Sequence, residues 1–328
     1  MWDRSLRYGY SGASMVFRGL LHLHERHLTM LTPSLPAVSD PEDDALPSGL
    51  PPVIDAHVHL FPDKLFASVR KWFDTFGWPI RHRLGSEEIL SFLFDRRVSY
   101  VVGLQYAHKP GIARELNRYM ASLCADYDRL VGMATVYPGE PDSAAILEEG
   151  FAMGLKGVKL HAHVQCFDMR SQGMKTVYRA CSDHRRPLVI HAGREPKSDA
   201  YACDPYRICG AEYVREVLRE YPDIRICVPH LGADEFGAYI HMLDEFDNLW
   251  LDTTMMLADY LPCPDIPKLT EYRPDRIMFG TDFPNLPYAW DREIKRLVKM
   301  SLPEYLLSRL LYQNAVEFFH IERNSGIE

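Results

Sequence analysis

The sequence predicts an α/β fold, a distorted (β/α)8 TIM barrel that follows an N-terminal extension. Apolar runs rich in β-branched residues recur eight times, with starts near residues 53, 99, 131, 157, 187, 224, 248 and 276. The segments 116–124 and 214–221 carry apolar residues at the i, i+3, i+4 and i+7 spacing of an amphipathic helix. Strands that alternate with helices indicate a parallel sheet, and eight repeats indicate closure into a barrel.

A doubly wound open sheet is the alternative fold. It would not gather side chains from the first, fifth, sixth and eighth strands around one point, as a barrel does. One such barrel uses about 250 residues. We therefore assign residues 52–328 to the barrel and residues 1–51 to an extension and linker. The segment 31–52 carries six prolines and an acidic cluster, which is typical of a linker.

The composition argues against nucleic acid or a membrane as partner, which leaves a small-molecule substrate as the expected partner. The net charge is −8, and no basic stripe marks a nucleic-acid surface. Arginines interrupt the apolar residues of segment 1–30, so we expect no membrane span there. Seven cysteines without Cys-x-x-Cys spacing favour a reduced, cytoplasmic setting. The aromatic segment 61–84 is a candidate lid, a satellite core or the contact of a possible homodimer.

Two histidines stand one residue apart in the first strand candidate, residues 53–62. Side chains at i and i+2 of a strand point to the same face, so His57 and His59 should converge. Two convergent imidazoles suit a divalent metal. A strand whose histidines are merely hydrogen-bonded is the alternative.

Three later strand candidates end on further metal-ligand residue types. His191 and His230 each end an apolar run ahead of a glycine, and Asp282 ends the run 276–284. In a barrel the C-terminal ends of the strands surround the active site. Three histidine-bearing strands followed by an aspartate-bearing strand therefore favour a metal site over core packing.

This ordered set resembles that of the amidohydrolase superfamily, and within it the branch that includes the aminocarboxymuconate semialdehyde decarboxylases. The resemblance covers residues 52–322. It implies that His57, His59, His191 and Asp282 bind one metal, while His230 and Asp282 are catalytic. Zinc is the default metal for such ligands, with manganese, iron and cobalt as alternatives.

The fourth strand candidate, residues 157–163, leaves the number of metal ions open. Some relatives carry a carboxylated lysine on this strand that bridges two metals, and Lys159 is the corresponding candidate. In that case His191 and His230 would bind a second ion. We favour one metal, with Lys159 paired to a carboxylate inside the barrel.

Five further residues are candidates for substrate contacts. With one metal, His161 and His163 are expected to line the pocket. Arg194 follows the fifth strand and could clamp a substrate carboxylate, or form only a surface ion pair. Tyr106 and His108 follow the second strand and could face the pocket, although a lone histidine there is more often a loop residue.

The resemblance implies a metal-activated water and two reaction classes. We predict a metal-dependent hydrolase that acts on an amide, lactone or ester carbonyl of a small, carboxylated molecule. The intact metal site and the lack of a second pocket arginine favour this reaction. The alternative is a nonoxidative decarboxylase of the aminocarboxymuconate semialdehyde type. A metal-independent lactonase and a non-catalytic barrel are further alternatives.

Overall fold

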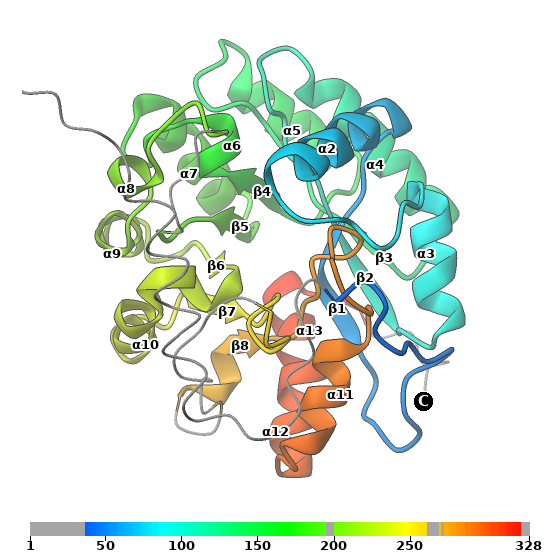
Figure 1. Cartoon of the computed structure of the whole chain (residues 1–328). Helices are drawn as coiled ribbons and strands as arrows, with labels where there is room; N and C mark the ends of the chain where they lie inside the picture. Colours follow the sequence, from blue (N-terminus) through cyan, green and yellow to red (C-terminus); the bar gives the residue numbers. More distant parts are fainter. Residues whose placement is uncertain (1–36, 195–199, 261–268, 270–271, 323–328) are drawn as a thin grey trace, which may run out of the picture.

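The computed structural model describes residues 37–194, 200–260, 269 and 272–322. Short parallel strands lie at its centre, with helices around their outside (Figure 1). The apolar runs predicted from the sequence form these strands, most of which are buried along their whole length. The strands are β1 (Ile54–His59), β2 (Tyr100–Leu104), β3 (Leu130–Gly132), β4 (Val158–His161), β5 (Leu188–His191), β6 (Ile226–Val228), β7 (Leu249–Asp252) and β8 (Ile277–Met278).

Backbone contacts join the strands into a closed barrel. Hydrogen bonds define one sheet in the order β1-β2-β3 and another in the order β4-β5-β6-β7-β8. A parallel bridge between Ala134 and Val158 links β3 to β4. On the other side, Val58 bridges to Phe283, which lies just past β8. The predicted distorted (β/α)8 barrel is therefore confirmed, and the open-sheet alternative is not needed.

Amphipathic helices cover the outside of the barrel. The predicted helices are present as α4 (Ala113–Asp126) and α9 (Ala211–Glu220), and α9 buries Val214, Val217 and Leu218 at the expected spacing. None of the helices in the described part of the chain is both long and apolar enough to cross a membrane. The α-helices are α2 (Asp63–Phe76), α3 (Ser86–Asp95), α4 (Ala113–Asp126), α5 (Ser143–Ala152), α6 (Ala162–Gln165), α7 (Gln172–Asp183), α8 (Pro205–Ile208), α9 (Ala211–Glu220), α10 (Phe236–Glu245), α11 (Arg292–Lys299), α12 (Glu304–Ser308) and α13 (Asn314–Phe319).

An irregularity in β1 decides which of its side chains face the barrel interior. The pairing of β1 with β2 shifts register between Asp55 and Val58. Ile54 and Ala56 pack inside the barrel with residues of the other strands and of α13. Val58 packs instead in the core outside the barrel. Because such a bulge changes the alternation, His57 and His59 face the interior on either side of Val58.

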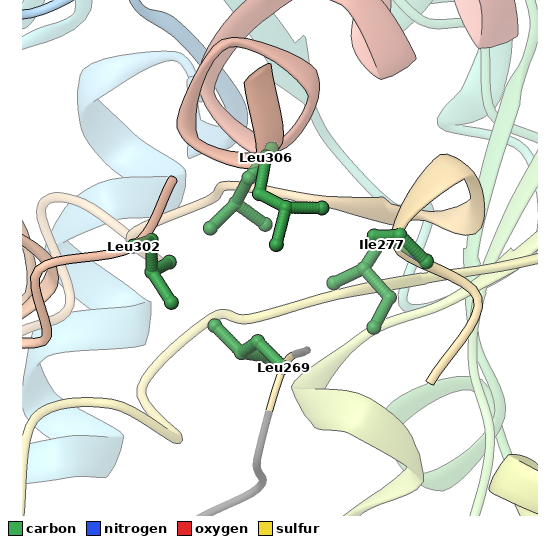
Figure 2. A pocket seen from close by; sticks show the side chains of 6 residues that line it. Leu269, Ile277, Leu302 and Leu306 are labelled. Carbon is green, nitrogen blue, oxygen red and sulfur yellow. The ribbon is translucent and has the colours of Figure 1, made fainter. Parts of the chain in front are cut away.

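An apolar pocket lies away from the ends of the strands that carry the histidines. Figure 2 shows it near the start of β8, beside α12. Its volume is about 10 Å³, which is about the space that one water molecule needs. It is too small for a substrate. The lining residues are Leu269, Pro274, Ile277, Leu302, Leu306 and Leu310.

The described part of the predicted extension, residues 37–51, packs on the outside of the barrel. Its anchor is Glu42, whose Oε2 accepts a hydrogen bond from the backbone N of Trp290 at 3.0 Å. The same oxygen lies 2.9 Å from Nε2 of His82 and 3.6 Å from Nε of Arg81. Burial alone would raise the pKa of Glu42, but these contacts lower it below its usual value. Residues 1–36 of the extension lie outside the described residues.

Glu42→Gln is expected to destabilise the protein by about 1.5–3 kcal/mol at pH 7. The carboxylate is stabilised in the folded state, so its contribution is present above the unfolded pKa and is lost as the pH falls through the folded pKa. The loss caused by the substitution should therefore shrink at pH 3. Urea unfolding of the unaltered protein and of Glu42→Gln at pH 7 and pH 3 measures this loss of stability, with the exposed Asp44→Asn as control. An equal loss at both pH values would contradict the assignment.

Candidate metal centre and active site

The strand-end residues singled out in the sequence lie at the C-terminal ends of the barrel strands. His57 and His59 end β1, and His191 ends β5. His230 begins the short helix η1 (His230–Glu235) just after β6, and Asp282 follows β8. These ends surround the mouth of the barrel, where the active sites of such enzymes lie.

Three of these residues form a candidate metal-binding triad, His57, His59 and Asp282. Oδ1 of Asp282 lies 2.9 Å from Nε2 of His59 and 3.6 Å from Nε2 of His57. One ligand atom from each residue lies within 4.8 Å of the other two. All three side chains are buried. Two imidazoles and one carboxylate are donors suited to zinc and other first-row metals, so the residues present fit a divalent ion.

Asp252, at the end of β7, orients the first ligand. Its Oδ2 lies 2.9 Å from Nδ1 of His57, and its Oδ1 accepts a hydrogen bond from the backbone N of His230 at 3.1 Å. Burial, and next the charge of Lys159, hold the pKa of His57 well below its usual value. The neutral ring therefore donates its Nδ1 proton to Asp252 and keeps the Nε2 lone pair for a ligand. No role for Asp252 was predicted from the sequence, although an aspartate at a barrel strand end was a usable signal.

The carboxylate of the triad is ionised at neutral pH. Burial alone would raise the pKa of Asp282, but the hydrogen bond from His59 and the electrostatic interaction with the rings of His59, His57 and His230 lower it to about 2. Asp282 can thus serve as a ligand and as a proton acceptor.

A third buried aspartate, Asp55, joins the two ligand-bearing segments. Its Oδ2 accepts a hydrogen bond from Oγ1 of Thr281 at 2.6 Å. Its Oδ1 accepts from the backbone N of Thr281 at 3.0 Å and of His57 at 3.2 Å. Because Thr281 precedes Asp282, these bonds fix the spacing of the ligands. Asp55 is a further functional candidate that the sequence analysis missed.

Six aromatic side chains form a closed circle at the mouth of the barrel. Neighbouring ring centroids lie between 4.0 and 5.7 Å apart all the way around. We call this set the mouth circle. In order it consists of His57, His59, Tyr106, His161, His191 and His230.

His191 belongs to the mouth circle and not to the metal triad. Its ring stacks on His161 with centroids 4.0 Å apart and an interplanar angle of 15°. The stacking follows from the strand register, since His161 and His191 are paired neighbours on β4 and β5 and project to the same side. A role of His191 as metal ligand, which the family resemblance implied, stays a prediction.

The predicted substrate contacts separate into two groups. Tyr106 and His161 lie in the mouth circle, and the buried His163 contacts His161 and His191 from α6. His108 is exposed on the loop after β2. The guanidinium of Arg194 is engaged by two glutamates. Its Nη2 lies 2.9 Å from Oε1 of Glu212, and its Nε lies 3.5 Å from Oε1 of Glu235. The geometry thus supports pocket roles for Tyr106, His161 and His163, and it gives no support to a carboxylate clamp at Arg194.

Lys159 projects from β4 into the centre of the barrel. Its Nζ lies 3.4 Å from Nε2 of His57, and the side chain is fully buried. Within the described ranges it forms no ion pair with a carboxylate, which corrects the expected pairing. Burial lowers the pKa of Lys159 to about 8, although the charges of Asp252 and Asp282 act in the opposite direction.

The aromatic segment after β1 reaches the wall of the mouth. Trp72 of α2 stacks on Tyr201 with centroids 5.9 Å apart, and Tyr201 in turn contacts the ring of His163 at 5.6 Å. Phe61 and Phe66 are buried against Tyr106 and the core. Part of segment 61–84 therefore packs in the core, which is closest to the predicted satellite core. Another part borders the mouth.

Comparison with known proteins agrees with this architecture. The family model described as Amidohydrolase matches residues 54–321. An uncharacterized TIM-barrel protein of Bordetella bronchiseptica is similar at 17% identity, with 82% of this chain and 98% of that chain covered and a TM-score of 0.63. No functionally curated protein sequence matches the chain.

Several of the similar structures are decarboxylases, among them the two that follow. The 5-carboxyvanillate decarboxylase of Novosphingobium aromaticivorans, solved with manganese and a nitrobenzoic acid derivative, has 16% identity, covers 86% of this chain and 100% of its own, and gives a TM-score of 0.62. The 2,6-dihydroxybenzoate decarboxylase of Rhizobium has 17% identity, covers 83% and 99%, and gives a TM-score of 0.60.

A closed (β/α)8 barrel with histidines and an aspartate gathered at its strand ends defines a metal-dependent barrel enzyme. The chain belongs to the amidohydrolase family, whose model spans most of its length. The resemblance inferred from the sequence motifs is therefore confirmed at the level of the superfamily.

Proposed function

We propose that this enzyme removes a carboxyl group as CO2 from a small planar acid by nonoxidative decarboxylation. The observation that carries the proposal is the mouth circle, which includes two of the three triad residues and lines the mouth with flat rings and with nitrogen atoms able to bind an anion. Lys159 adds a positive charge 3.4 Å from His57. A planar carboxylate fits such a site because rings stack on its faces while N–H groups and the cation bind its oxygens.

In this proposal the metal site binds the substrate's carboxylate and a side chain of the protein delivers the proton. The triad would hold a divalent ion, with zinc or manganese as candidates, and this ion would supply Lewis-acid chemistry toward the substrate's carboxylate. When the bond to the carboxyl carbon breaks, the electron pair stays on the ring carbon and must receive a proton. Asp282 is ionised and holds no proton to give at neutral pH. We therefore assign proton delivery to His230.

The contacts of His230 suit that role. Its Nδ1 lies 3.0 Å from the carbonyl oxygen of Thr254, so this nitrogen donates to the backbone. The remaining nitrogen, Nε2, is then the atom that can take a proton from water and pass it to the substrate. The known activities of the two decarboxylases lend the proposal further support, since both act on hydroxybenzoic acids.

Hydrolysis of an amide, lactone or ester is the second candidate. The observation that favours it is the position of Lys159 beside His57, because a carboxylated lysine there would reach the centre of the site. Asp282, ionised at neutral pH, would then accept a proton from the attacking water.

The cytoplasmic location, the homodimer and the absence of nucleic-acid partners also remain proposals.

The two candidates are separated by incubating the metal-loaded enzyme with a panel of hydroxybenzoic acids in D2O. Decarboxylation should yield CO2 and a product with deuterium at the carbon that lost the carboxyl group, read by NMR. His230→Gln should lower this rate by about 10²–10⁴-fold without changing the metal content. Turnover of lactones or amides, with no CO2 from any acid, would overturn the proposal in favour of hydrolysis.

Lys159→Ala is expected to leave one metal ion per chain, as in the unaltered protein. The substitution removes a positive charge beside His57, so it should not weaken the binding of a cation. Elemental analysis of both proteins measures the content, with the exposed Lys156→Ala as a matched control. Two ions per chain, reduced in Lys159→Ala alone, would show that the lysine is a bridging ligand and would favour hydrolysis.

A further inference from the structure

Three cysteines gather beside the mouth circle, around His163 of α6. Sγ of the buried Cys209 lies 3.0 Å from Nε2 of the His163 ring. The other two thiols reach the backbone of the same residue. Sγ of Cys166, which follows α6, and Sγ of Cys203, from the segment after β5, each lie 3.3 Å from the His163 carbonyl oxygen. Two thiols that share one acceptor atom are neighbours in space.

The side chains of Cys166 and Cys203 also influence each other. Burial, and next the hydrogen bond with the Cys166 thiol, raise the pKa of Cys203 to about 12. Both residues are half-buried, whereas Cys181, Cys209 and Cys227 are buried. A small oxidant dissolved in water can therefore reach this pair more easily than the three buried thiols.

A metal site is not the explanation for this cluster. In the part of the chain that the structure describes, the metal triad is the one group of three or more potential ligands whose atoms all lie within 4.8 Å of one another. The cysteines around His163 do not meet that condition. An adjacent pair of accessible thiols without a metal is instead the starting point of a disulfide.

We propose that Cys166 and Cys203 are an oxidation site that closes to a disulfide and ties the segment after β5 to the end of α6. The inference stands on the shared contact of the two thiols with His163 and does not depend on the reaction that the enzyme catalyses. The bond would join two parts of the wall of the mouth. The ring centroids of His163 and Tyr201, one from each part, lie 5.6 Å apart.

A peroxide is the oxidant class that balances the reaction. One thiol attacks the O–O bond and becomes a sulfenic acid, while the peroxide leaves as water or an alcohol. The second thiol then attacks the sulfenic sulfur, the S–S bond forms, and water leaves. The pair loses two electrons and two protons in total, and the peroxide is reduced by two electrons. Because the Cys203 thiol is protonated at neutral pH, the reaction should be slow and need an excess of oxidant.

Trypsin provides a direct test on the full-length protein. Cleavage after lysine and arginine places Cys166 in the peptide 160–170 and Cys203 in the peptide 198–207, each with a single cysteine. The protein is treated with excess hydrogen peroxide, unreacted thiols are alkylated, and the digest is analysed by mass spectrometry. We expect these two peptides joined by a disulfide that dithiothreitol cleaves, and neither peptide joined in the untreated, reduced sample.

Variants distinguish this pair from its neighbours. In Cys166→Ser the peptide 198–207 should carry the alkylating reagent after oxidation, and in Cys203→Ser the peptide 160–170 should do so. A link from either peptide to 208–215, which carries Cys209, would overturn the assignment. Full alkylation of Cys166 and Cys203 after oxidation of the unaltered protein would overturn the proposal as well.

Discussion

His59→Ala is expected to lose the bound metal and to lower any metal-dependent turnover by more than about 100-fold. The substitution removes one of the two imidazoles of the triad and the hydrogen bond of 2.9 Å to Asp282. Even residues that only hold a metal ligand in place change affinity or activity by about 10–100-fold, so a ligand should cost more. Metal content is measured by elemental analysis after equilibrium dialysis against one equivalent of zinc or manganese.

The matched control is His108→Ala, which removes an exposed histidine from the loop after β2. It should keep one ion per chain. Circular dichroism of both variants shows that the barrel has folded, so that a loss of metal is not a loss of structure. Full metal content in a folded His59→Ala would mean that the ion binds elsewhere, and the assignment of the triad would be wrong.

Asp252→Asn is expected to weaken metal binding by about 10–100-fold. The asparagine keeps the shape of the side chain and can still accept hydrogen bonds from the backbone N of His230 and of Thr254. It loses the negative charge of Oδ2, which lies 2.9 Å from Nδ1 of His57. In the unaltered protein that charge keeps the proton on Nδ1 and leaves Nε2 as the ligand atom. Competition with a fluorescent chelator measures the affinity.

The stability of the metal-free proteins separates this effect from a general loss of structure. The free energy of unfolding in urea, measured without metal, should change less than the free energy of metal binding does. The hydrogen bonds that the side chain at position 252 accepts from the backbone remain in the variant. The exposed Asp244→Asn of α10 should change neither quantity. If Asp252→Asn binds metal as tightly as the unaltered protein, the aspartate does not orient the ligand.

Local patterns in the sequence were sufficient for the barrel and for the order of the ligands. Helical spacing in 214–221 predicts α9 because one face of a surface helix must be apolar, and that face is buried in the structure. Likewise, a polar residue at the end of an apolar strand marks the mouth of a barrel, so His230 and Asp282 were identifiable from strand position.

Partners that are distant along the chain were not predictable in this way. Asp252 meets His57 across 195 residues, and Thr281 meets Asp55 across 226. Nothing in the local sequence states which strand ends face each other at hydrogen-bond distance. The same holds for Arg194, which has acidic residues nearby in sequence but pairs with Glu212 and Glu235.

The eight alternating elements, the family motifs and the residue types of the metal site could be predicted from the sequence, because each depends on short-range periodicity or on residue identity. How these side chains meet depends on the three-dimensional fold. The bulge in β1 turns His57 and His59 inward on either side of Val58. The register of β4 and β5 stacks His191 on His161, and closure of the barrel brings Lys159 to His57. Those contacts depend on strand pairing, which is a property of the whole barrel.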